Sequence, residues 1–161
     1  MSYSSKKNLV SIIAGILLTI AYSIYALGGK APVAGDLQSW AVAMLVFIGI
    51  SIAALVVIQV LFHIGLAIGI AVKENGHDEK KVERILESSM VEDEREKLIG
   101  LKASHIGGII AGIGFVAALV TLAVGLSAVF ALHIVFGAFA IGSIIEGCVS
   151  IYHHERGVQN G

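Results

Sequence analysis

The segment 40-WAVAMLVFIGISIAALVVIQVLFHIGLAIGIAV-72 contains no aspartate, glutamate, lysine or arginine. An α-helix rises about 1.5 Å per residue, so roughly 20 apolar residues cross the ~30 Å hydrocarbon core of a bilayer. The segment is longer than one crossing requires, and we expect its helix either to tilt in the bilayer or to project into water. Its length and composition predict a membrane-spanning helix.

Three more apolar runs, at about 9–28, 103–128 and 129–152, accompany this segment. Hydrophobic residues make up 57% of the 161-residue chain and charged residues only 14%. The last two runs have no charged divider, so we expect their turn near Gly125–Leu132. These features predict an all-α, integral membrane four-helix bundle of two hairpins, with residues 1–161 as a single transmembrane domain.

The distribution of basic residues predicts the orientation in the membrane. All but Lys30 of the 11 lysine and arginine residues fall on one side of the four-span arrangement. We expect a multi-pass protein of the cell membrane. Because cytoplasmic loops carry the excess of positive charge, both termini and the loop 73–102 should lie in the cytoplasm. The run 9–28 is longer than the apolar part of a signal peptide, and we expect a retained span.

The cytoplasmic loop has a helical pattern of its own. In 77-HDEKKVERILESSMVEDEREK-97, apolar residues such as Val82, Ile85 and Leu86 recur at helical spacing among charges, which predicts an amphipathic helix between the second and third spans. Acidic residues exceed basic ones across 73–102, so anionic lipid is a poor partner. We expect either a contact with a cytoplasmic protein or a solvated connector, and no nucleic-acid partner.

Small residues at four-residue spacing indicate where membrane helices approach one another, because association in lipid depends on close packing. Every predicted span carries such residues, and the helix-packing candidates are Gly15, Gly65, Gly69, Gly108, Gly112 and Gly142. These residues build a four-helix monomer or leave one face for a second copy, and we expect a homo-oligomer.

Ionisable side chains inside a span are costly and mark candidate functional sites. Gln59, His63, His105 and Glu146 form a predicted polar cluster in the inner half of the bilayer, since counting from the flanking charges places them at similar depths. His105 shares a helix face with Gly108 and Gly112, so we expect it to point toward a neighbouring helix.

Three interpretations of this cluster remain open. Glu146 can accept hydrogen bonds from a histidine and fix the helix register, or the cluster can relay protons or cations. The third interpretation is a metal site of His63, His105 and Glu146. No nucleophile elbow, phosphate loop, paired-cysteine or HExxH motif occurs, so we expect no catalytic residue, no enzyme activity and no cofactor.

The stretch 93-DEREKLIGLKA-103, followed at once by an apolar run, resembles the signature of an uncharacterised family of small bacterial and archaeal four-span membrane proteins. Its members carry a DER(D/E) motif before the third span and a Lys-Ala pair soon after, matched here by Asp93–Glu96 and by Lys102 and Ala103. The resemblance implies a prokaryotic inner membrane. Relatives encoded beside small helix-turn-helix regulators imply a signalling role.

The same motif predicts a clamp that holds the loop against the bundle. Asp93 and Lys97 stand four residues apart in the favourable order, and Arg95 can bind a carboxylate. We therefore expect a non-enzymatic, self-associating membrane protein whose loop contacts protein, in a scaffold or signalling role. The alternative is a small transporter or channel subunit that moves protons or cations through the His/Glu cluster.

Overall fold

The computed structural model describes residues 3–73 and 94–156 and contains four helices: α1 (Tyr3–Leu27), α2 (Leu37–Lys73), α4 (Glu94–Ala123) and α5 (Ala128–Arg156). No strand occurs among these residues, and all four helices are long and apolar enough to span a membrane. The all-α four-helix prediction is confirmed. The predicted loop helix lies outside the described residues, except that 94–97 form the first turn of α4.

A turn joins the two helices of each hairpin, and residues in each turn explain where the helices begin or end. Asp36 accepts a hydrogen bond from the Ser39 backbone N–H at 3.0 Å, which caps α2, and hydrogen bonding to Ser39 lowers the pKa of Asp36. At the end of α4, Gly125 adopts a φ of 80°. Its N–H bonds the Leu122 carbonyl and the next N–H bonds the Thr121 carbonyl, the pattern of a Schellman cap.

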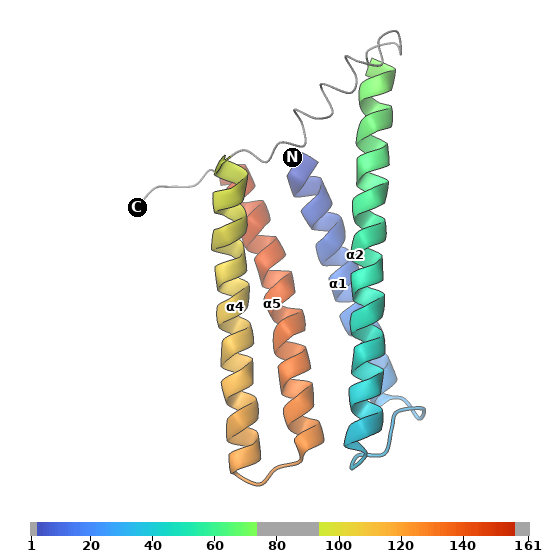
Figure 1. Ribbon diagram of the computed structural model, residues 1–161, viewed down its shortest axis with the longest axis vertical. Helices are drawn as coiled ribbons and strands as arrows, with labels where there is room; N and C mark the ends of the chain where they lie inside the picture. The colour runs from blue at the N-terminus through green and yellow to red at the C-terminus, as the bar shows by residue number, and fades with distance from the viewer. Residues whose placement is uncertain (1–2, 74–93, 157–161) are drawn as a thin grey trace.

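The helices stand in a curved row in the order α4, α5, α1, α2 (Figure 1). α5 packs against α4 on one side and α1 on the other, and α1 packs against α2. No contact joins the described parts of α2 and α4, so the bundle is open on one side. We call the end with the turns 28–36 and 124–127 the turn end, and the opposite end the terminal end.

α4 and α5 approach closely through glycine. A Cβ atom on Gly142 would lie 2.9 Å from the Gly107 carbonyl oxygen, and one on Gly114 would overlap the Ala138 side chain. The packing face of α4 thus contains Gly107 and Gly114, not the predicted Gly108 and Gly112, which have nothing within 4 Å of an added Cβ.

The remaining candidate glycines divide between contact and open space. A Cβ on Gly15 would lie 3.9 Å from the Ile144 side chain, so α1 faces α5 at this point. Gly65 and Gly69 of α2 have nothing within 4 Å of an added Cβ. Inside this chain, therefore, α2 does not use its glycine pair.

An aromatic cluster holds α1, α2 and α5 together near the turn end. Tyr22 lies 4.3 Å from Phe136 and 5.2 Å from Phe47 between ring centroids, and Trp40 lies 4.6 Å from His133. His133 also contacts the Val129 carbonyl oxygen through Nδ1 at 2.7 Å. The aromatic cluster consists of Tyr22, Tyr25, Trp40, Phe47, His133 and Phe136.

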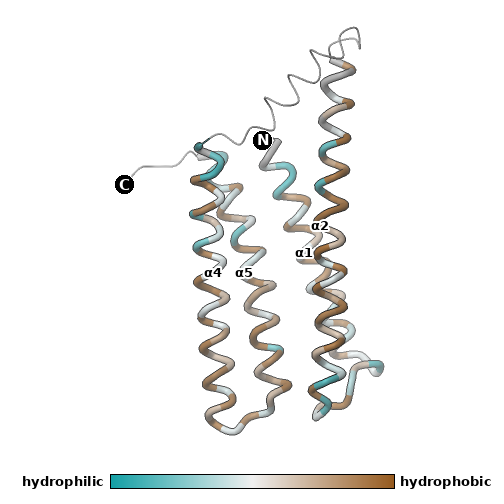
Figure 2. Tube along the Cα trace, viewed as in Figure 1, coloured by the Kyte–Doolittle hydropathy of each residue, from teal (hydrophilic) through white to brown (hydrophobic). Residues whose placement is uncertain are grey.

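α2 is much longer than its partners, and its terminal end projects beyond the starts of α1 and α4 (Figure 1). Among its described side chains, the buried hydrophobic ones are Trp40 and Met44, which both lie in its first turns. Figure 2 shows hydrophilic residues at the starts of α1 and α4, whereas the last turns of α2 are not similarly hydrophilic. The described part of α2 thus extends past the starts of its neighbouring helices at the terminal end.

Candidate intramembrane cavity

A cavity of about 740 Å³ lies between α1, α2 and α5 and reaches the first turns of α4. Each helix contributes a stripe at helical spacing, because residues three or four apart share a face. The stripe of α5 consists of Phe136, Ala140, Ser143, Gly147, Ser150 and His154, with Ile144 and Glu146 beside it. Ser11, Gly15 and Thr19 on α1 continue the polar and small lining.

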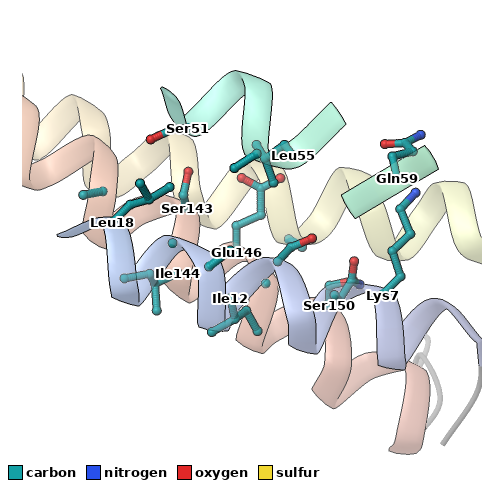
Figure 3. Close-up of a pocket in the computed structure, with 18 of the residues that line it drawn as sticks. Lys7, Ile12, Leu18, Ser51, Leu55, Gln59, Ser143, Ile144, Glu146 and Ser150 are labelled. Atoms are coloured by element: carbon teal, nitrogen blue, oxygen red, sulfur yellow. The ribbon is translucent and has the colours of Figure 1, made fainter. Parts of the chain in front are cut away.

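Figure 3 shows three levels along the cavity. Ser51, Leu18 and Ser143 lie together toward one end, and Gln59, Lys7 and Ser150 toward the other. Glu146 lies between these levels, near Leu55. The cavity therefore runs from the aromatic cluster, whose Phe47 and Phe136 line it, to the charged terminal end, and it carries one carboxylate near its middle.

The carboxylate of Glu146 lies against the backbone of α4. Its Oε2 would be 3.0 Å from a Cβ atom placed on Gly107, so a side chain at that position would displace the carboxylate. Glu146 is half-buried, and no hydrogen bond or ion pair joins it to another described residue. Within residues 3–73 and 94–156, Glu146 is thus an acidic side chain without a polar partner in an apolar span, which marks it as a candidate functional group.

Gln59 and His63 also line the cavity, but nearer the terminal end than the sequence predicts. Figure 3 places Gln59 level with Lys7, and His63 follows one helical turn later on the rising helix α2. The predicted depth was measured from Lys73, whereas α2 projects past the start of α1, which shifts His63 toward the mouth. The structure thus brings Gln59, His63 and Glu146 to one cavity at different depths.

His105 does not join this group, and its predicted orientation is wrong. The side chain is exposed and lies in a shallow groove with Leu101, Ser104, Gly108 and Ile109. On a helix, position 105 stands opposite position 107, and Gly107 is the residue that faces α5. The proposed metal set is therefore not assembled: within residues 3–73 and 94–156, no three metal-ligating side chains gather.

The predicted loop clamp is only partly visible. Asp93 lies outside the described residues, and of Arg95 only the backbone, within the first turn of α4, is described. Lys97 is exposed. Glu94 and Glu96 stand in the first turn of α4, where negative charge is favourable to the helix dipole.

Two polar residues that sequence reasoning missed contribute to the cavity. The Asn8 side-chain amide donates a hydrogen bond of 2.8 Å to Ser150 Oγ, which ties α1 to α5 near the terminal end. Ser51 donates to the Phe47 carbonyl oxygen at 2.8 Å, within its own helix. The available signal was spacing, since Ser51 and Gln59 stand eight residues apart on one face of α2.

In comparisons with known proteins, no protein-family model, curated protein or solved structure matches the chain.

Proposed function

We propose that this chain is a small transporter or channel subunit that moves protons or cations, with Glu146 as the binding group. The observation that carries the proposal is the half-buried Glu146 carboxylate, which lines the cavity without an ion pair or hydrogen bond to any described residue. A carboxylate inside a membrane span favours a cationic partner, because an isolated charge is costly there. A purely structural role favours pairing with His63 or Gln59 instead.

The ends of the cavity support a path with unequal access. Lys7, Glu96 and His154 line it near the terminal end, where water hydrates charged side chains. Phe47 and Phe136 line the opposite end, where the aromatic cluster packs three helices together. Such a cavity loads from the terminal end, and release on the far side requires the aromatic cluster to separate.

The direct test is proton flux into liposomes that contain the purified protein and a trapped pH-sensitive dye. We expect Glu146→Gln to lower the flux at least about tenfold, because the amide cannot carry a proton between water and the cavity. The control is Glu155→Gln, which removes an exposed carboxylate on the same helix outside the cavity. Equal flux for the wild type and folded Glu146→Gln protein would refute the proposal.

In the proposed orientation, the terminal end faces the cytoplasmic side of the cell membrane, as the distribution of lysine and arginine favours. Ala34 in the turn 28–36 is exposed, which makes it a suitable labelling site. With Cys148 replaced by serine, a cysteine at position 34 is expected to react with a membrane-impermeant maleimide in intact cells. Labelling only after the cells are lysed would reverse the orientation.

A second candidate function is that of a self-associating scaffold whose segment 73–102 contacts a cytoplasmic protein. The observation that favours it is on α2, where Gly65 and Gly69 are exposed and no described residue lies within 4 Å of a Cβ atom added to either. Glycines four residues apart allow two membrane helices to approach closely. The two functions are compatible, since oligomeric transporters keep a binding site in each subunit.

A further inference from the structure

The cavity is more apolar than a site for a bare inorganic ion. Ile12, Leu18, Leu55 and Ile144 line it at the levels on either side of Glu146 (Figure 3). Hard cations such as Ca²⁺ and Mg²⁺ require six or more oxygen atoms that converge at about 2.0–2.6 Å. Glu146 supplies two carboxylate oxygen atoms at its level of the cavity, and the other carboxylate that lines it, Glu96, lies near the terminal end, so the two do not provide that arrangement.

The hydroxyl groups of the cavity do not converge either. Thr19 donates its proton to the Gly15 carbonyl oxygen at 2.8 Å, and Ser51 donates to Phe47 at 2.8 Å. Both hydroxyls are thus held against their own helices. They make the walls locally polar without forming a ring of ligands.

The size of the cavity suits an organic molecule. Its volume of about 740 Å³ falls inside the range of roughly 300–1,000 Å³ typical of small-molecule sites, which are mostly apolar with a few placed polar groups. Phe136 precedes Glu146 by ten residues on α5, a rise of about 15 Å. A ligand that spans part of this length places its charge beside Glu146 and its apolar body toward Phe136 and Phe47.

The open side of the bundle gives such a ligand a second way in. Since the described parts of α2 and α4 do not touch, the cavity is not walled off between them. A lipophilic molecule dissolved in the bilayer reaches the cavity from that side, whereas a hydrated ion does not cross hydrocarbon. The apolar walls and the access from the bilayer both favour a lipophilic ligand.

We propose that the cavity binds a lipophilic organic cation, with the cationic centre at Glu146 and the apolar groups against Phe136 and Phe47. This inference deepens the proposed function, since it rests on Glu146 as the binding group and names the substrate class.

Equilibrium dialysis of the detergent-purified full chain with tetraphenylphosphonium tests the inference. We expect saturable binding that Glu146→Gln weakens at least about tenfold, as the loss of a charge-assisted contact predicts. Phe136→Leu should weaken it by about fivefold through the lost aromatic contact. The controls Glu155→Gln and Phe139→Leu change residues outside the cavity and should bind as the wild type does.

A measurement on the unaltered protein covers the case in which a variant fails to fold. A hydrophobic carbodiimide modifies accessible membrane carboxyl groups, and mass spectrometry of the peptide containing Glu146 reports the modified fraction. Tetraphenylphosphonium is expected to protect Glu146, and the uncharged analogue triphenylphosphine oxide is not. Absence of protection, or equal protection by both compounds, would overturn the inference.

The result is separable from that of the flux experiment. Proton flux that depends on Glu146, without tetraphenylphosphonium binding, would overturn the inference and leave the proposed function standing. Binding that depends on Glu146, in a protein that conducts no protons, would keep the organic-cation site and overturn the conduit.

Discussion

Leucine in place of Gly114 is expected to separate α4 from α5 and to destabilise the folded protein by about 3 kcal/mol, the upper part of the usual range for overpacking. Even a methyl group at this position would overlap the Ala138 side chain, and leucine adds three more carbon atoms. Because the backbones of both helices meet here, the helices must move apart to accommodate it. Unfolding in mixed micelles with increasing sodium dodecyl sulfate, followed by Trp40 fluorescence, measures the loss.

Gly112→Leu provides the matched control on the same helix. Gly112 is exposed, and nothing lies within 4 Å of an added Cβ, so the side chain points into open space. We expect this variant to unfold at the same detergent ratio as the wild type, or slightly later, since leucine favours a helix more than glycine by somewhat less than ~1 kcal/mol. If Gly112→Leu proved the more harmful change, the assignment of the α4 packing face would be wrong.

Leucine at both Gly65 and Gly69 is expected to convert an oligomer into a monomer without unfolding the chain. The two glycines lie one helical turn apart on α2, and a Cβ atom added to either meets nothing within 4 Å among the described residues, so the substitutions leave the described packing intact. In lipid, helix association depends on close backbone approach, which two leucine side chains prevent. Light scattering on protein eluting from a size-exclusion column gives the protein mass within the micelle.

The same measurement on Gly112→Leu distinguishes two possible interfaces. The exposed Gly108 and Gly112 of α4 form a second small-residue pair, and their replacement should leave the oligomer unchanged if α2 provides the contact. A monomeric wild-type protein would contradict self-association altogether. Loss of the oligomer only in Gly112→Leu would assign the interface to α4 instead.

The fold could be predicted from the sequence because the features that decide it are local in the sequence. The long uncharged run 40–72 and its three companions fix the number of helices, since a bilayer demands a minimum apolar length. The turn between the last two runs was placed near Gly125–Leu132, and Gly125 adopts the left-handed conformation that ends α4. Both features depend on neighbouring residues alone.

The packing face of α4 could not be predicted in the same way. Gly107, Gly108, Gly112 and Gly114 place glycine on two faces of one helix, and the sequence of α4 does not rank them. The choice depends on α5, where Gly142 and Ala138 fit against Gly107 and Gly114. His105 was predicted to face a neighbouring helix because it shares a face with Gly108 and Gly112. Its predicted orientation therefore failed together with the predicted packing role of these two glycines.

The candidate site was predicted where side-chain spacing along one helix was sufficient. Gln59 and His63 stand four residues apart on one face of α2, and both line the cavity. The relative heights of different helices were not predictable, because they depend on how far α2 projects past α1. His63 therefore lies nearer the mouth than residue counting implied.

The attachment of α2 gives it the mechanics of a lever arm. Its buried hydrophobic side chains, Trp40 and Met44, lie near one end, and the described part of the helix extends to Lys73. At 1.5 Å per residue the helix rises about 39 Å from Phe47, its last residue in the aromatic cluster, to Lys73, so a tilt of ~10° about Phe47 would displace the tip by about 7 Å. A small tilt at the aromatic cluster would therefore become a larger displacement at the terminal end of α2.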